Sequence, residues 1–404
     1  MSPAKHADAG CVEVVALQPV AVVDHLGRPV SSAFLRRNVA IGGHELGGSE
    51  RVTPGELASL LSKLEADGTD TRIVTKAGGS AANTARGLSR GFGVRAGLLG
   101  AVGDDQWGNL FKQAMRDARV DVSNLSEKPG ATGRCACFVE EGSGQRTMRT
   151  CMQDAVRLEA REILSRLGDA FQNPLRGASW VLIPGYAFYG AGLVDAAAAA
   201  AAEANCKVAL ALASFEIVRS FGTEIEALLR SRRVSAVFAN EDEARELTKY
   251  AETSLKTKTK TQTRAEDEKL FLDVATDSLF ESPETAADRA LDVLARWSPA
   301  CVAVVTLGDK GCVAARGDPF SNREKGGTSE RVACEAFEEI VAKDSTGAGD
   351  LFVSGFLYGL LRGAPLGECA ELGCLAGAAA TQSVGAEVSD EGWAWVRDRR
   401  PLLL

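Results

Sequence analysis

The strongest chemical signal in the sequence is a glycine-rich turn within KDSTGAGDLFVSGFLYGLLRG, residues 343–363. Apolar residues recur at helical spacing after the turn, so we expect a strand to end at Asp344 and a helix to follow. Glycines at 347 and 349 let the backbone turn sharply and approach a ligand closely. The free N–H groups of the first helical turn, together with the helix dipole, predict an anion site at Gly347, Ala348 and Gly349.

Asp350 lies inside this predicted anion site. A carboxylate there would repel phosphate unless it acted on a neighbouring group. One interpretation is a general base that takes a proton from a hydroxyl, while the adjacent N–H groups stabilise the charge of a transferring phosphoryl group. The other is a first-turn acid that the helix dipole favours. The residue types alone leave both open.

A second glycine-rich segment, KAGGSAANTARGLSRGFG, covers residues 76–93. Its close glycines, Gly78 and Gly79, would admit a polar substrate against the backbone. Asn83, in the first turns of the helix that follows, offers one hydrogen-bond donor pair and one acceptor. Taken by itself, this segment is equally typical of tight packing between a strand and a helix.

Composition excludes several classes of function. The 404 residues contain 46 Lys and Arg against 54 Asp and Glu, and the resulting charge of −8 argues against a nucleic acid or an anionic membrane as partner. There is no apolar run of about 18 residues that could span a bilayer. With only three histidines, zinc sites of the usual kind and histidine-based triads are disfavoured.

The ten cysteines form no CxxC pair, so we interpret them as free thiols in a reducing compartment. Cys135 and Cys137 alternate with Ala136 as they would on one face of a strand. The free thiols favour a cytoplasmic location, although a short organellar transit peptide remains open. The GFGVRAG segment misses the dinucleotide-binding spacing by one residue, so a dinucleotide-dependent oxidoreductase is disfavoured. Neither glycine-rich segment is a GxxxxGK[ST] phosphate loop, because that pattern occurs nowhere in the sequence.

The elements that must position these residues alternate along the chain. Apolar runs that read as strands buried on both faces lie at 12–17, 95–103, 180–185, 207–213, 234–240 and 301–308. Helical patterns lie at 53–66, 81–90, 108–118, 195–205, 241–250 and 286–297. This alternation predicts a doubly wound α/β fold with a mostly parallel sheet.

Four segments depart from the alternation. We expect parts of 27–75 and 131–150 to form a small lid, the latter as a hairpin with EGSGQ at its turn. The Thr/Lys-rich segment 254–269 is predicted to be disordered, because it cannot bury a core. Residues 316–331 are predicted to form a long surface loop between two strands.

Together, the two glycine-rich segments resemble the signatures of the PfkB (ribokinase-like) carbohydrate and nucleoside kinase family. Gly78, Gly79 and Asn83 match the family's N-terminal pattern, and residues 344–350 match its D-[ST]-x-G-A-G-D pattern in full. The resemblance runs from about residue 12 to residue 395 and implies one kinase domain. It implies a three-layer α/β/α sandwich with a mostly parallel central sheet and a small lid.

The resemblance also implies a reaction. Asp350 would accept the proton of a primary hydroxyl, which attacks the γ-phosphate of ATP bound with Mg²⁺. Further matches are Asn240 and Glu243, which in the family lie near magnesium and the phosphates, with Glu243 acting on the ion indirectly. Thr306, Gly308 and Gly311 match the nucleotide side, and Asp24 lies where the family places a carboxylate on substrate hydroxyls.

Each of these matches has a structural alternative. Asn240 and Glu243 could cap and open the following helix. Asp24 could be a turn residue, and Thr306 an ordinary strand end. Cys374 is a departure, because family members often carry an asparagine near this place, and the change puts an adenine contact there in doubt.

The early helical insertion and the hairpin look most similar to the adenosine-kinase-like branch, so the preferred acceptor is a nucleoside. An aromatic clamp for its base would have to come from Phe34 or Phe138 of the lid. The alternatives are a free sugar such as ribose or fructose, or a polyol, and third an inactive scaffold protein of the same family. A monovalent cation, and the choice between monomer and homodimer, stay open.

Overall fold

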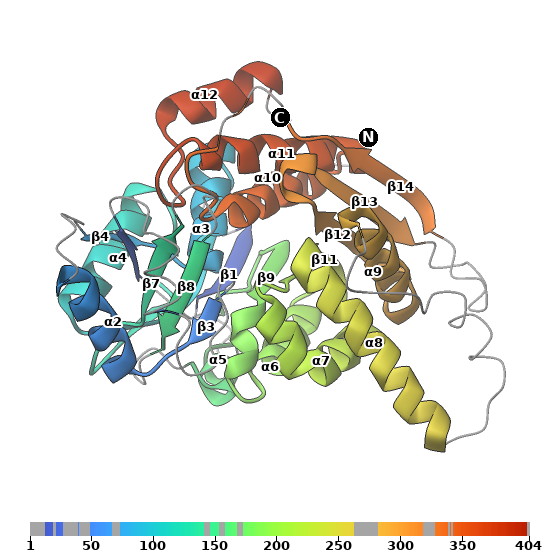
Figure 1. Cartoon of the computed structure of the whole chain (residues 1–404), viewed down its shortest axis with the longest axis horizontal. Coiled ribbons are helices and arrows are strands. Elements are labelled where there is room, and N and C mark those ends of the chain that lie inside the picture. The colour runs from blue at the N-terminus through green and yellow to red at the C-terminus, as the bar shows by residue number, and fades with distance from the viewer. Residues whose placement is uncertain are drawn as a thin grey trace.

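The main body of the protein is built around a nine-stranded sheet, seen in the computed structural model in Figure 1. The structure describes residues 13–18, 22–26, 39, 49–66, 73–140, 146–152, 158–167, 173–261, 282–317, 328–337, 340 and 342–401. The sheet has the order β14-β13-β12-β11-β10-β9-β1-β5-β6. Its strands are β1 (Val14–Gln18), β5 (Ala96–Gly103), β6 (Leu125–Lys128), β9 (Trp180–Pro184), β10 (Lys207–Ala211), β11 (Val234–Asn240), β12 (Val302–Thr306), β13 (Cys312–Gly317) and β14 (Thr328–Cys334). The strands from β12 to β6 pair in parallel, and β13 and β14 extend that edge in antiparallel fashion.

Both faces of this sheet are buried, which is why its strands read as continuous apolar runs. Successive side chains point to opposite faces. Val14 and Leu182 join one hydrophobic cluster, whereas Val15 and Val181 join another. The parallel strands therefore need helices on both sides.

Helices cover each face and complete three layers (Figure 1). One face carries α3 (Ser80–Arg86), the π-helical turn Gly87–Gly91, α4 (Gln106–Asp117), α10 (Ala348–Arg362), α11 (Leu366–Thr381) and α12 (Asp390–Arg399). The other carries α5 (Ala160–Leu167), α6 (Leu193–Glu203), α7 (Phe215–Arg230), α8 (Glu241–Thr261) and α9 (Pro283–Trp297). The predicted three-layer α/β/α fold is confirmed.

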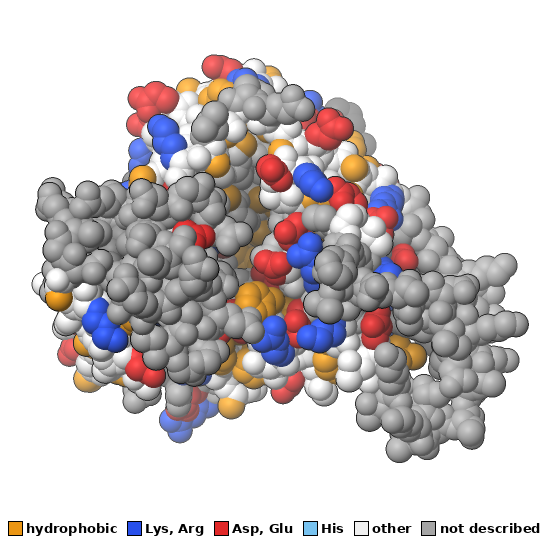
Figure 2. Space-filling model, in the orientation of Figure 1, with side chains coloured by type: hydrophobic (Ala, Val, Ile, Leu, Met, Phe, Trp, Pro, Cys, Tyr) orange, Lys and Arg blue, Asp and Glu red, His pale blue; other side chains and the backbone are white. Residues whose placement is uncertain are grey.

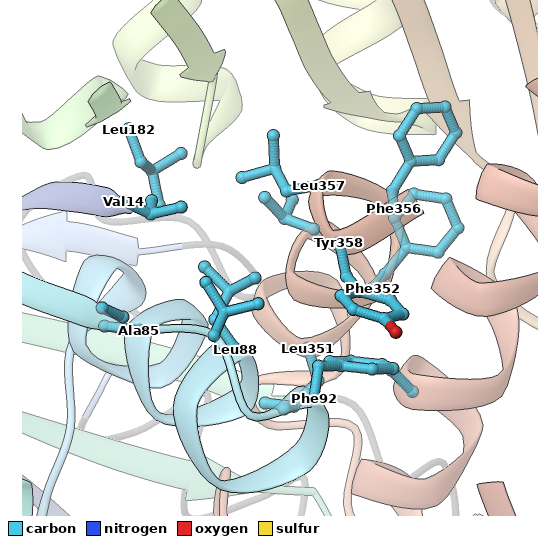
Figure 3. Packing of buried hydrophobic residues seen from close by; sticks show 14 of the residues in the cluster. Val14, Ala85, Leu88, Phe92, Leu182, Leu351, Phe352, Phe356, Leu357 and Tyr358 are labelled. Atoms are coloured by element: carbon cyan, nitrogen blue, oxygen red, sulfur yellow. The ribbon is translucent and has the colours of Figure 1, made fainter. Parts of the chain in front are cut away.

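Tight packing joins α3 and its π-helical extension to α10, as Figure 3 shows. The rings of Phe92 and Tyr358 stack with their centroids 4.7 Å apart. A Cβ atom at Gly87 would lie 2.5 Å from Ser354 Oγ, so side chains of α10 pack directly on the backbone of Gly87, at a distance that only glycine permits. This contact fixes the relative position of the two glycine-rich segments singled out in the sequence.

A second, five-stranded sheet forms the lid, on the left of Figure 1. Its order is β3-β8-β7-β2-β4, formed by β2 (Val22–Leu26), β3 (Ser49–Arg51), β4 (Ile73–Ala77), β7 (Arg134–Val139) and β8 (Arg146–Cys151). Helix α2 (Pro54–Ala66) packs against it. The predicted hairpin is confirmed as β7 and β8, while its turn, 141–145, lies outside the described residues.

Three local predictions differ from the structure. Residues 254–261 of the segment predicted to be disordered continue α8, and 262–269 lie outside the described residues. The predicted loop 316–331 ends earlier, because β14 begins at Thr328. The strand predicted to end at Asp344 is absent: the described residues before α10 form a loop whose N–H groups at Lys343 and Asp344 donate to Thr381 O.

The close packing of α10 on α11 gives a test of the fold. A Cβ atom at Gly355 would lie 2.2 Å from the carbonyl oxygen of Leu372, so we expect Gly355→Ala to lower the free energy of unfolding by about 1–3 kcal/mol. Gly367→Ala is the matched control, because a Cβ atom at this exposed glycine of α11 would meet no atom within 4 Å, and we expect a gain of about 0.5–1 kcal/mol. Denaturant midpoints measure both; similar midpoints for the two variants would contradict the packing.

Candidate active site

A cleft of about 850 Å³, including the part open to solvent, lies between the lid and the main sheet. The face drawn in Figure 2 is hollowed near its centre, with hydrophobic side chains in the recess. Residues from the lid and from helices and loops of the body line the cleft: Ser49, Arg51, Cys135, Arg146, Met148, Thr150 and Met152 from the lid side, and Gly79, Ser80, Asn83, Tyr186, Tyr189, Ala213, Thr346, Gly347 and Asp350 from the body.

Asp350 reaches the cleft from the first turn of α10. Its Oδ1 accepts a hydrogen bond from Ser80 Oγ at 2.7 Å, and its Oδ2 accepts one from Asn83 Nδ2 at 2.8 Å. Both donors lie on α3, so the two glycine-rich segments meet at this carboxylate. The placement that the general-base interpretation requires, a carboxylate facing the cleft beside Asn83, is therefore present.

Burial raises the pKa of the Asp350 carboxyl above its ordinary value. The hydrogen bonds from Asn83 and Ser80, and the nearby charges of Arg146 and Arg86, oppose this effect because they favour the ionised form. The outcome is a carboxylate that is a stronger base than an exposed aspartate. Position and basicity together suit it to accept a proton from a bound hydroxyl.

The turn before α10 is held by Asp344, which is buried. Its Oδ1 accepts from the N–H of Thr346, and its Oδ2 from the N–H of Gly385, each at 2.8 Å. Gly347 then takes the left-handed conformation, with φ of 76°, as the residue before α10. Of the three residues predicted to form the anion site, Ala348 already donates its N–H to Ser345 O at 3.2 Å.

Arg146, which none of the sequence motifs indicated, enters the site from the start of β8. It donates a hydrogen bond to the carbonyl oxygen of Ser345. Its positive charge opposes the rise that burial causes in the pKa of both Asp350 and Glu243. The available signal was its place directly after the predicted hairpin turn.

Asn240 and Glu243 form a reciprocal cap at the start of α8. Asn240 Oδ1 accepts from the N–H of Glu243, while the backbone N–H and Nδ2 of Asn240 donate to the two carboxylate oxygens, all at 2.9 Å. Glu243 is 3% exposed, and burial raises its pKa to about 8. The capping alternative is thus confirmed, and a role near phosphates stays a prediction.

The predicted nucleotide-side residues gather at one edge of the sheet. Asn240 and Thr306 are register partners at the carboxyl ends of β11 and β12. Gly308 and Gly311 follow with positive φ, and a Cβ atom at Gly311 would lie 2.0 Å from Cys334 O. Cys374 of α11 lies against the neighbouring strand, with its Sγ 3.7 Å from Cys312 Sγ.

The remaining predicted residues divide between the cleft, the body and the lid. Gly79 lines the cleft at the N-terminus of α3, with φ of 98°, whereas Gly78 is buried beside it and does not line the cleft. Asp24 lies on β2, opposite Thr75 and Ala136. A contact between Asp24 and substrate stays a prediction.

The predicted aromatic clamp is wrong for Phe138 and untested for Phe34, which lies outside the described residues. Phe138 is fully buried in the cluster between the lid sheet and α2. Cys135 and Cys137 share the opposite face of β7, as predicted, and Cys135 lines the cleft. The aromatic lining comes instead from Tyr186 and Tyr189, in the turn after β9, which no sequence motif indicated.

The turn before α10 gives a test of the site's geometry. We expect Gly347→Ala to lower stability by about 1–2 kcal/mol, because the residue has positive φ and its new Cβ would lie 2.2 Å from Ala386 Cβ. Gly349→Ala, whose Cβ would meet no atom within 4 Å, should unfold at the wild-type midpoint. Thermal unfolding of the two variants measures the difference, and equal losses would argue against this turn.

Among the described residues, no helix is both long and apolar enough to cross a membrane, and every described cysteine is a free thiol.

Comparisons with known proteins agree with the geometry of the site. An adenosine kinase from Schizophyllum commune is 28% identical over 317 residues, covering 76% of this chain and 80% of that protein. An uncharacterized sugar kinase from Archaeoglobus fulgidus matches locally, at 35% identity over 106 residues, or 26% of this chain and 36% of that protein.

Among solved structures, the adenosine kinase from Sinorhizobium meliloti superposes with a TM-score of 0.73 at 26% identity, covering 96% of this chain and all of the other. A model of the pfkB family of carbohydrate kinases matches residues 56–392, which is most of the chain and includes both glycine-rich segments. This chain therefore belongs to the pfkB family of carbohydrate kinases, phosphotransferases whose acceptor is an alcohol group.

Proposed function

We propose that this protein transfers the γ-phosphoryl group of ATP to a primary hydroxyl of a nucleoside, with Asp350 as the general base. The observation that carries the proposal is the Asp350 carboxylate, at the N-terminus of α10, which faces the cleft and is held by Ser80 and Asn83. A base at a helix N-terminus lies next to N–H groups that favour phosphate. The same spot thus serves both the acceptor and the donor.

In the reaction, the acceptor hydroxyl enters the cleft and forms a hydrogen bond with the Asp350 carboxylate. As its oxygen bonds to the γ-phosphorus, the proton passes to Asp350 and the bond to the β-phosphate oxygen breaks, releasing ADP. The backbone N–H groups of Gly347, Ala348 and Gly349 stabilise the phosphoryl oxygens, and Ala348 exchanges its contact with Ser345 for this purpose. Catalysis rests chiefly on position, because the chemistry needs little from the base.

Arg146 is the residue by which the lid contributes positive charge to the site. It lines the cleft near Asp350, and its guanidinium offers several donors in a fixed fork that suits phosphate oxygens. Because it lies on β8, it accompanies the lid. The lid therefore places a positive charge where the phosphoryl group would react.

The donor set fits magnesium bound mainly through the nucleotide. Among the described residues, no group of three or more His, Cys, Asp or Glu side chains is arranged to hold a metal. Glu243 has both carboxylate oxygens engaged by Asn240, so it is suited to act on the ion indirectly. When bound, Mg²⁺ would neutralise part of the phosphate charge.

The cleft's lining favours a nucleoside over a free sugar. Tyr186, Tyr189, Met148 and Met152 place aromatic and thioether groups around it, which suit a flat heterocyclic base. A free sugar would leave this apolar surface uncovered. The Schizophyllum commune and Sinorhizobium meliloti proteins are both adenosine kinases, which supports the same acceptor class.

A coupled assay for ADP release, run with nucleosides, pentoses, hexoses and inositols, tests the acceptor and the base together. We expect turnover with a nucleoside and a loss of about 10²–10⁴ in kcat for Asp350→Asn. Because burial raises the pKa of Asp350, its ionised form costs stability at neutral pH, so Asp350→Asn should unfold at the wild-type temperature or above. Turnover with sugars alone would select the free-sugar alternative, and an active Asp350→Asn would refute the base.

The pH dependence of kcat/KM tests the hydrogen bond from Ser80. Removing a donor to the ionised carboxylate raises the pKa of Asp350 further, so in Ser80→Ala the acid limb should move to higher pH. Thr84→Val is the control, since Thr84 Oγ1 donates to the backbone oxygens of Ser80 and Asp350 and spares the carboxylate. An acid limb that moves equally in both variants would contradict the assignment.

A further inference from the structure

Arg86 is a buried cation beside the site that the proposed mechanism leaves unexplained. It lies one turn after Asn83 on α3 and is 7% exposed. Its Nη2 donates a hydrogen bond to Asn83 Oδ1 at 2.9 Å. It therefore contacts the residue that contacts Asp350.

This contact determines which way the Asn83 amide faces. A side-chain amide has an accepting end and a donating end. With Oδ1 occupied by Arg86, Nδ2 is the end that faces Asp350 Oδ2, at 2.8 Å. The reversed amide would set its oxygen against the carboxylate and its N–H groups against a guanidinium, two repulsive contacts in place of two hydrogen bonds.

Arg86 is itself held from its other side. Its Nη1 donates to Glu387 Oε1 at 3.0 Å, and its Nη2 approaches Ala386 O at 3.4 Å. Lys76 Nζ donates to Glu387 Oε2 at 3.2 Å and to Val384 O at 3.1 Å. Since Lys76 lies on β4, a continuous chain of polar contacts runs from the lid sheet to Asp350.

The buried guanidinium carries a cost. Burial lowers the pKa of Arg86, against the opposing effects of Glu387 and Asp350, and its Nε is buried without a hydrogen-bond partner among the described residues. Apolar side chains of similar size often replace a buried ion pair without loss of stability. Packing alone thus gives no reason for an arginine here, whereas an oriented donor and a positive charge near Asp350 do.

We propose that Arg86 is a positioning residue that fixes the orientation of Asn83 and, through it, holds the Asp350 carboxylate in place for proton transfer, with Glu387 and Lys76 as its anchor. This inference rests on the proposed function of Asp350. It adds a role for Arg86, Glu387 and Lys76, none of which is a matched position in the two glycine-rich patterns.

Arg86→Met tests the proposal, since methionine fills the space without a donor or a charge. We expect kcat to fall by about 10- to 100-fold with little change in KM for ATP, because a displaced base slows transfer without removing nucleotide contacts. Its acid limb should move to higher pH, because Arg86 and Arg146 are the charged groups that lower the pKa of Asp350. Added guanidinium should restore part of the rate, and Arg86→Lys should be intermediate.

Arg90→Met is the matched control, because Arg90 follows on the same helical stretch and pairs with the exposed Asp390 at 2.9 Å. It should keep the wild-type rate and pH profile. Glu387→Gln tests the same anchor in a variant that should fold, because the Glu387 side chain is 45% exposed. Its kcat should fall in the same direction, but by less than in Arg86→Met. If Arg90→Met matches Arg86→Met, or Glu387→Gln is fully active, the proposal fails.

A double-mutant cycle shows whether Arg86 acts through Asn83. If it does, the losses in Arg86→Met and Asn83→Ala should be strongly non-additive, and additive losses would overturn the inference. The pKa of the Asp350 carboxyl, followed by ¹³C NMR and assigned with Asp350→Asn, reads the same effect without turnover. A higher pKa in Arg86→Met shows that Arg86 acts on the Asp350 carboxyl even if Asp350→Asn were active and the proposed base wrong; an unchanged pKa refutes the inference.

Discussion

Two hydrogen bonds to one carboxylate hold this site together. Asp350 joins the N-terminus of α10 to α3 through Ser80 and Asn83, residues separated from it by 270 and 267 positions in the chain. Such bonds are short only if both helices keep their places on the sheet. The glycine contact between Gly87 and Ser354, and the stacked rings of Phe92 and Tyr358, provide that constraint (Figure 3). Hydrophobic packing therefore sets the geometry on which the polar site relies.

The lid contributes three side-chain contacts to the body near the site. Arg146 donates a hydrogen bond to the loop that precedes α10, and Lys76 donates one to Glu387. Cys137 Sγ lies 3.5 Å from Thr346 Oγ1. These contacts come from three different strands of the lid sheet, β8, β7 and β4. The body contributes the Asp350 carboxylate, the N-terminus of α10 and the buried Arg86. Positive side chains near the carboxylate therefore come from both the lid and the body, as Arg146 and Arg86.

The sequence was most informative where the site is local. Gly347 and Asp350 are near neighbours in the chain, so their joint placement at a helix start follows from turn and helix chemistry. The fold followed from strands that are apolar on both faces. Arg146, Tyr186 and Tyr189 were missed because only long-range pairing brings them to the cleft. Phe138 was misplaced because alternation along β7 turns it away from the face that carries Cys135.

Two errors have equally plain causes. The sequence before Asp344 resembles a strand, yet the N–H groups of Lys343 and Asp344 donate to Thr381 O rather than to a neighbouring strand. In 254–261, the low-complexity sequence contains no glycine or proline, so the helix that the Asn240 and Glu243 cap begins can propagate into it. Composition alone predicts disorder for 254–261, but these residues are helical because they continue α8.

The distance along the chain between α3 and α10 has a consequence for synthesis on the ribosome. Leu88 and Phe92 are covered by Leu351 and Tyr358, which emerge more than 250 residues later. Until then the nascent protein carries an uncovered apolar surface next to an incomplete cleft, which slows folding and promotes aggregation. A chain cut short before α10 would share that exposed surface, which makes it a substrate for chaperones and proteases rather than a smaller working enzyme.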